Sequence, residues 1–336
     1  MLKNKTIFTL SVVAAAIALS ACQPKQPEPK KEDKVTQSQA AQAEALTLVG
    51  DTEKLTLNLP ECDGNSCPEI SIERLSSNQA FIDEFIDQQI LKQLEQSVDI
   101  SPKSLKAGQQ VTAAGGNSKD SNPAQASEAA GSEAAASETI ETPKQKLEKQ
   151  VAPYLQTFLA LDKELKALSA SHQISLMIKP KILNAAQPLA TVVLNSSSYL
   201  GGAHGSSSQY YYNFDLKKKK LVALDDILLP KQKAVLEQKA HEEFKRWVID
   251  SKLANSVEEY EQAWKFTLSD NFYLSTQGLI LQYGEYEIGP YVVGLPRLTI
   301  PYEQLQSVLK KEYLPPVEVK NDAASASAAV ANKARS

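Results

Sequence analysis

The stretch that decides the fold is residues 189–216, which read LATVVLNSSSYLGGAHGSSSQYYYNFDL. Its two ends, Leu189–Tyr199 and Ser208–Leu216, predict strands because they are rich in β-branched, aromatic and small polar residues. The glycines between them predict a hairpin or a bulge, since glycine tolerates the positive φ of tight turns. Tyr210 to Tyr212 must alternate faces along a strand, so we expect at least one ring to point outward.

Strands and helices follow irregularly on both sides of this stretch. An apolar stripe at helical spacing predicts helices over 77–96, with Ser77 as N-cap, and over 231–250. Pro301 is expected to begin a closing helix that runs to Lys311. Because no βαβ rhythm is present, we predict an α+β fold, with a mostly antiparallel sheet and packed helices. Further strands are expected at 69–75, 172–183, 271–275, 279–283 and 295–300.

The lysine run 217–220 lies between two predicted strands. We interpret it as a solvated hairpin turn, with a basic docking patch as the alternative.

The aromatic residues predict the domain organisation. Of the 22 aromatics, 17 lie between Tyr199 and Tyr313. This density indicates two subdomains, a leaner companion at 46–170 and a C-terminal domain at 171–313. Three segments are poor in large apolar residues and are expected to be disordered, because they cannot offset their chain entropy. They are a tether at 22–45, an insertion at about 100–142 and a tail at 314–336.

The N-terminus predicts export and lipid attachment. Lys3 and Lys5 precede an apolar run that is too short to span a bilayer but is typical of a secretory signal peptide at 1–21. Leu19-Ser-Ala-Cys22 resembles the lipobox of bacterial lipoproteins, which implies acyl chains such as palmitate on Cys22. An ordinary signal peptide with a chance cysteine is the alternative. Gln23 stands where Asp commonly retains lipoproteins at the inner membrane, so we expect the outer membrane, on its periplasmic or its surface face.

Charge and cysteine content exclude several classes of function. The net charge of −4 becomes −4 − 2 = −6 without the two lysines of residues 1–21, which argues against a nucleic-acid binder. Cys62 and Cys67 flank a short turn in an oxidising compartment and predict a structural disulfide. Three Cys and three His leave little material for a metal or haem site, so we expect no cofactor.

Two groups of motifs resemble one known family. The first contains SYLGGAHG at 198–205 and YNFDL at 212–216, followed by LDDIL at 224–228. The second contains YEIGPY at 286–291 and LTIPY at 298–302. In this order they resemble the extracellular domain of the anti-sigma factor RsiV, which also accompanies the deacetylase domain of PdaC-type cell-wall enzymes.

The resemblance implies an envelope binding module, not an enzyme. Because RsiV is thought to recognise lysozyme through this region, the resemblance implies a lysozyme-like wall hydrolase as the first expected partner, with peptidoglycan or another glycan as the alternative. A membrane is the further expected partner, through the lipid on Cys22. The residues expected to contact the partner are Tyr199, His204, Tyr210, Tyr212, Tyr286, Glu287 and Tyr291.

An unrecognised wall hydrolase is the remaining alternative. His204 could pair with Asp215 or Asp226, but no motif marks a nucleophile. Glu285 and Glu287 would share one face of a strand, and paired carboxylates can catalyse glycoside hydrolysis. In glycosidases, however, such carboxylates usually come from separate elements.

Overall fold

The computed structural model describes residues 46–62, 66–98, 141–168 and 173–316. The predicted signal peptide, the tether with Cys22, nearly all of the insertion and nearly all of the tail lie outside these residues. Within the described residues, no helix is both long enough and apolar enough to cross a membrane. Cys62 and Cys67 form the predicted disulfide, with 5.8 Å between their Cα atoms.

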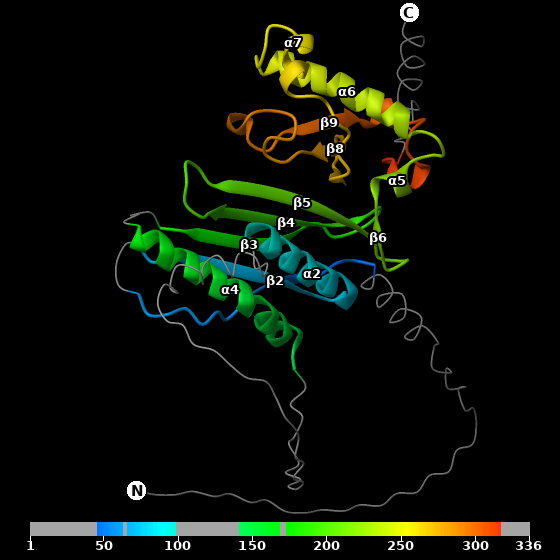
Figure 1. Ribbon diagram of the computed structural model, residues 1–336. Coiled ribbons are helices and arrows are strands. Elements are labelled where there is room, and N and C mark those ends of the chain that lie inside the picture. The colour runs from blue at the N-terminus through cyan, green and yellow to red at the C-terminus, as the bar shows by residue number, and fades with distance from the viewer. Residues whose placement is uncertain (1–45, 63–65, 99–140, 169–172, 317–336) are drawn as a thin grey trace, which may run out of the picture. The chain divides into compact units, whose positions relative to one another are not determined.

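A six-stranded sheet forms the first half of the described chain (Figure 1). Its strands follow one another in sequence order, and all neighbours are antiparallel except β2 and β3. A parallel pair needs a long crossover, which the two helices between these strands provide. The strands are β1 (Gly50–Lys54), β2 (Glu69–Ser77), β3 (Ser175–Asn184), β4 (Ala190–Tyr199), β5 (Ser206–Asp215) and β6 (Lys220–Val222).

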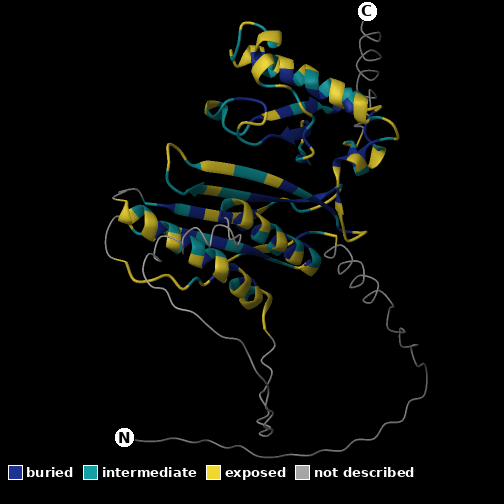
Figure 2. Ribbon diagram, in the orientation of Figure 1, coloured by how far each residue is buried: buried dark blue, intermediate teal, exposed yellow. Residues whose placement is uncertain are grey.

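Helices α2 (Ala80–Ser97) and α4 (Pro143–Ala167) cover one face of this sheet (Figure 1). Figure 2 shows the result: the helices are buried on the side that meets the sheet and exposed on the other. On α2 the predicted apolar stripe is buried, whereas the prediction of Ser77 as N-cap is wrong. The helix begins two residues later because Ser77 Oγ donates instead to Asp83 Oδ1 and accepts from the Gln79 N–H.

The second half packs two helices on a smaller sheet. An antiparallel three-stranded sheet contains β7 (Phe272–Leu274), β8 (Gly278–Gln282) and β9 (Arg297–Pro301). Buried residues of α6 (Lys233–Asp250) and α7 (Val257–Ala263) share one core with this sheet. The short elements are α5 (Leu224–Ile227), η1 (Tyr291–Val293), α8 (Tyr302–Leu305) and η2 (Lys311–Tyr313).

The predicted closing helix from Pro301 to Lys311 is wrong beyond its first turn, α8. Leu309 forms an isolated antiparallel bridge with Leu228, and the Lys310 N–H donates to Ile227 O at 2.9 Å. Pairing with the α5 segment therefore replaces the helical bonds that this stretch would otherwise make.

Two asparagines join the smaller sheet to β5. The side-chain amide of Asn271 bonds β5 as the backbone of a neighbouring strand would. Its Oδ1 accepts from the Tyr211 N–H at 2.8 Å and its Nδ2 donates to Gln209 O at 2.7 Å. Asn213, which is 1% exposed, donates to Phe272 O at 2.8 Å. Satisfied buried amides of this kind fix one arrangement, because leaving them unpaired costs free energy.

The described residues form an α+β fold with two hydrophobic cores. One core lies between the six-stranded sheet and α2 and α4, and it draws residues from Leu48 to Leu216. The other draws residues from Leu189 to Tyr313. The boundary expected at 170/171 therefore passes through one sheet and one core, since β2 pairs with β3 across it.

Candidate binding site

The turn between β4 and β5 presents His204 at one end of the sheet. Gly201 and Gly202 have φ of 90° and 103°, which side chains other than glycine rarely adopt. A Cβ on Gly205 would lie 2.7 Å from Ser198 O, so a glycine is needed there too. His204 Nδ1 lies 3.0 Å from Gly205 O and its Nε2 lies 3.0 Å from Tyr286 Oη. A neutral imidazole with its hydrogen on Nδ1 satisfies both partners.

The loop that follows β8 supplies the other rings. Tyr286 lies at the tip of a turn and has a φ of 62°. The prediction that Glu285 and Glu287 lie on a strand is therefore wrong. Glu287 Oε2 accepts from the Gly284 N–H at 2.7 Å and closes this turn. Tyr291 begins the 3-10 helix η1. The carboxylates of Glu285 and Glu287 therefore stabilise the loop, because each accepts a hydrogen bond from a backbone N–H.

Four rings from three separate segments gather here, and we call them the aromatic surface. His204 stacks on Tyr291 with ring centroids 3.9 Å apart and planes at 21°. Tyr286 lies 5.9 Å from Tyr291 and 6.5 Å from Trp264. Tyr286 is 49% exposed. The rings are thus preorganised by contact with one another while part of their area stays in solvent.

Glu285 fixes this loop to the sheet. Its Oε1 accepts from the Ser207 N–H at 2.8 Å, and its Oε2 accepts from Ser206 Oγ at 3.1 Å. Because Ser206 and Ser207 begin β5, the carboxylate links the loop after β8 to the turn that carries His204. The position of the rings relative to the sheet therefore depends on one acidic side chain.

A polar groove includes Ser207, whose N–H donates to Glu285, the sequence neighbour of Tyr286. Its volume is about 250 Å³, and Met177, Lys179 and Leu295 flank it. Hydroxyls and amides provide both donors and acceptors along it. The polar lining residues are Asn195, Ser196, Ser197, Ser207, Ser208 and Gln209.

The structure brings together only some of the residues predicted to contact a partner. His204, Tyr286 and Tyr291 meet, and Glu287 lies in the same loop. Tyr199 Oη donates to Gly202 O at 3.0 Å, inside the turn that presents His204. Tyr210 is exposed, as expected for one of the three consecutive tyrosines, but it is not among the four rings.

Tyr212 is directed toward α2 and away from any ligand. Its Oη donates to Gln89 at 3.2 Å, its ring packs edge-on against Phe85, and burial raises its pKa above the usual range. Sequence reasoning missed Trp264, since no local pattern connects it with residues twenty positions or more away.

Neither the pairing of His204 with Asp215 nor the other two histidines gain support as a catalytic or metal site. Asp215 lies nine residues from Ser206 along β5, at the opposite end from His204, and it pairs with Lys218. His241 Nε2 lies 2.7 Å from Glu261 Oε1 and its ring stacks on Phe266, as a packing residue does. His172 lies outside the described residues. In the part of the chain that the structure describes, no three His, Cys, Asp or Glu side chains are grouped as metal ligands would be.

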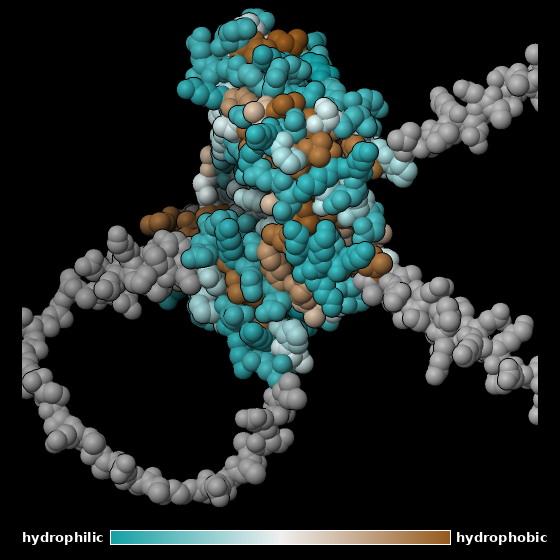
Figure 3. Space-filling model, turned by 90° about the vertical axis from the view of Figure 1, so that its right-hand side faces the viewer, coloured by the Kyte–Doolittle hydropathy of each residue, from teal (hydrophilic) through white to brown (hydrophobic). Residues whose placement is uncertain are grey.

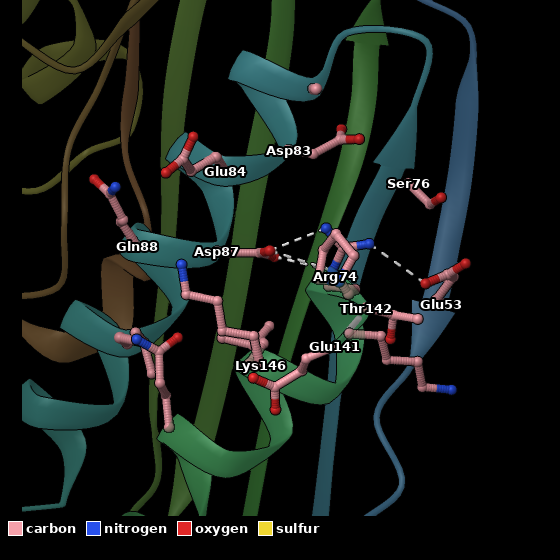
Figure 4. A pocket seen from close by; sticks show the side chains of 16 residues that line it. Glu53, Arg74, Ser76, Asp83, Glu84, Asp87, Gln88, Glu141, Thr142 and Lys146 are labelled. Carbon is pink, nitrogen blue, oxygen red and sulfur yellow. Dashed lines mark hydrogen bonds and ion pairs between the residues drawn. The ribbon is translucent and has the colours of Figure 1, made fainter. Parts of the chain in front are cut away.

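A larger cavity, of about 750 Å³, lies elsewhere, between β2, α2 and the start of α4 (Figure 4). Arg74, whose side chain is 5% exposed, donates to Asp87 at 2.9 Å and to Glu53 at 3.4 Å. Burial raises the pKa of Asp87, although Arg74 acts in the opposite direction. Figure 4 shows Arg74 pointing at these two carboxylates from the strand. The ion pair holds α2 and β1 to β2, and we interpret it as structural.

Residues 225–303 match the family model described as protein of unknown function (DUF3298). Peptidoglycan-N-acetylmuramic acid deacetylase PdaC of Bacillus subtilis (strain 168) is 24% identical over an alignment of 187 residues, and the match covers 53% of this chain and 38% of that protein. The chain thus spans well under half the length of this relative. A DUF3298 domain and a distant similarity to PdaC confirm the expected relationship in this coarser form.

Two solved structures of DUF3298 family proteins are also similar. The one from Pseudomonas aeruginosa PAO1 has a TM-score of 0.50 at 19% identity and covers 80% of this chain and 95% of its own. The one from Bacteroides fragilis NCTC 9343 has a TM-score of 0.45 at 18% identity and covers 79% and 93%. The first likeness shows the fold alone.

Proposed function

We propose that this chain is a non-catalytic binding module of the bacterial envelope, held at the outer membrane by lipid on Cys22, that binds peptidoglycan glycan strands. The observation that carries the proposal is the aromatic surface beside the polar groove. Sugar rings have apolar faces, which stack on aromatic rings, and hydroxyl edges, which need hydrogen-bond partners. A partly exposed, preorganised ring cluster next to serine, asparagine and glutamine side chains offers both.

The relative PdaC supports the choice of ligand. PdaC is named as a deacetylase of peptidoglycan N-acetylmuramic acid, so a domain shared with it has a reason to contact the same polymer. The carboxylates of the site are engaged by backbone and serine donors, which leaves them poorly placed for acid–base work.

Co-sedimentation with purified sacculi tests the proposal. The mature chain from residue 22, carrying Cys22→Ser to prevent lipidation, should pellet with sacculi and release no soluble muropeptides. Tyr286→Ala and Tyr291→Ala should each weaken binding about 5- to 10-fold, because an aromatic contact contributes about 1–1.5 kcal/mol. Tyr210→Ala is the matched control, since Tyr210 is an exposed tyrosine outside the aromatic surface. Equal binding by all three variants would remove the site from consideration.

A lysozyme-like wall hydrolase is the second candidate, favoured by one further observation. Val292, which is 86% exposed, lies next to Tyr291 in the same loop, and an exposed apolar residue beside aromatic rings is typical of a protein-binding hot spot. The predicted mature charge of −6 favours encounter with a basic enzyme. Pull-down with a c-type lysozyme separates the two candidates: Val292→Ser should weaken lysozyme capture and leave sacculus binding unchanged. Absence of capture at micromolar lysozyme would eliminate this partner.

A further inference from the structure

The two ends of the six-stranded sheet carry different side chains. The Leu48 N–H donates to Ala185 O at 2.7 Å, just beyond the end of β3. Asp215 and Lys220 stand opposite each other in the antiparallel register of β5 and β6, next to the turn that joins the two strands. Residues 46–49 and the turns 185–189 and 216–219 therefore lie at one end, which we call the proximal end. The turn that presents His204 lies at the other, the distal end. Ten-residue strands at about 3.4 Å per residue place the two ends about 30 Å apart.

Four consecutive lysines form the turn at the proximal end. Lys218 pairs with Asp215 at 3.0 Å and Lys220 pairs with Asp226 at 3.7 Å. The ammonium groups of Lys217 and Lys219 have no carboxylate partner among the described residues and are exposed. Two positive charges at this end are thus free to meet an outside anion.

The backbone conformation at residue 219 is unfavourable for lysine. Its φ is 50°, in the left-handed region that glycine and asparagine adopt at lower cost. The four neighbouring lysines also repel one another. Within the described residues the Lys219 side chain makes no hydrogen bond or ion pair that would offset either cost, which suggests that its charge serves a partner.

Aliphatic side chains accompany the lysines at this end. Leu46, Val49, Leu183 and Leu221 are between 36% and 58% exposed. Figure 3, which views the chain from this side, shows hydrophobic side chains in separate groups among hydrophilic ones. Scattered aliphatic groups beside lysines are typical of surfaces that rest in a membrane interface, where the chains meet lipid and the ammonium groups meet phosphate.

The first described residue, Leu46, lies at this end and is close in sequence to the predicted lipid. Residues 23–45 separate Leu46 from Cys22, and a random-coil chain of that length has a reach of about 25–30 Å. We propose that the proximal end docks on the anionic phospholipid headgroups of the membrane that holds Cys22, so that the distal aromatic surface points away from it. The inference rests on the proposed lipid anchor. Tethering raises the local concentration to about the millimolar range, so weak docking is sufficient to orient the domain.

Vesicle co-sedimentation of the mature chain carrying Cys22→Ser tests the docking without the lipid. The chain should bind phosphatidylglycerol-containing vesicles more tightly than pure phosphatidylcholine vesicles. The double variant Lys217→Gln/Lys219→Asn should lower the partition coefficient about 25-fold, since each lysine near an anionic surface contributes about fivefold, or about 1 kcal/mol. Asparagine is chosen at 219 because it tolerates the left-handed backbone.

A matched control is available on the other half of the chain. Lys245→Gln/Lys252→Asn removes the same charge from exposed positions, and Lys252 has a similar φ of 54°. This variant should bind vesicles like the wild type. The docking proposal is overturned if anionic vesicles are not preferred, or if the two double variants bind equally. Mass spectrometry of the native protein tests lipid on Cys22 separately, and sacculus binding tests the distal site, so each failure can be told from the others.

Discussion

The buried ion pair between Arg74 and Asp87 gives a prediction about stability that can be worked out from the structure. Arg74→Met keeps a long apolar stem but removes the guanidinium that pairs with Asp87, whose side chain is 15% exposed. An uncompensated buried carboxylate costs about 3–5 kcal/mol. We expect about 3 kcal/mol at pH 7, because Asp87 retains some solvent and Glu53, at 44% exposed, loses little.

The loss should depend on pH with a defined sign. In the wild type, burial already raises the pKa of Asp87, and removing Arg74 takes away the group that opposes this shift. A carboxyl with a raised folded-state pKa destabilises the protein as pH rises above its unfolded value of about 3.9. The variant should therefore be impaired most at pH 7 and least near pH 4.

Urea unfolding followed by circular dichroism measures this effect. At roughly 3 kcal/mol per molar urea, the midpoint should fall by about 1 M at pH 7. The double variant Arg74→Met/Asp87→Leu should recover most of the loss, because an apolar pair of similar volume replaces the ion pair. A midpoint change below about 0.3 M, or the same change at pH 4 and pH 7, would refute the reasoning.

Three further changes have defined outcomes. Gly278→Ala would place a Cβ 2.1 Å from Ile300 O, so the pairing of β8 with β9 should be disrupted and the free energy of unfolding should fall by about 3 kcal/mol or more. A melting temperature like that of the wild type would contradict this. Burial raises the pKa of Tyr283, so the free energy of unfolding should fall above about pH 10. The urea midpoint should therefore be lower at pH 10.5 than at pH 8, and Tyr283→Phe should make this difference smaller. Cys62→Ser/Cys67→Ser should cost about 2 kcal/mol by loop-closure entropy, and reductant should destabilise the wild type equally but leave the variant unchanged.

Local patterns were sufficient to predict the elements that bury one regular face. The stripe of α2, the strands β4 and β5 and the helix α6 are predicted from residues that neighbour one another in sequence. The capping serine was misplaced because Ser77 bonds Asp83, a choice that depends on the preceding strand. The closing helix failed because a distant segment, α5, competes for its backbone.

The long-range features of the site could not be predicted in the same way. The four rings of the aromatic surface come together because Asn271 joins β5 to the second sheet and because Glu285 reaches Ser207. The glycine-rich turn and the tyrosine-rich loop were recognised as candidates, yet the contact between them has no local signal. Tyr212 was expected at the site as one of three consecutive tyrosines. Strand alternation instead directs it toward α2, while Tyr211 stacks on Tyr273 of the second sheet.

The direction in which β1 runs has a mechanical consequence. If the wall is held at the distal end and Cys22 is held in a membrane, tension enters the described chain at Leu46 and acts along the strands. β1 begins opposite Ser77 and is antiparallel to β2 over five residue pairs. Such a pull shears these pairs together instead of peeling them one by one, so an edge strand of five residues can carry load between two layers that move relative to each other.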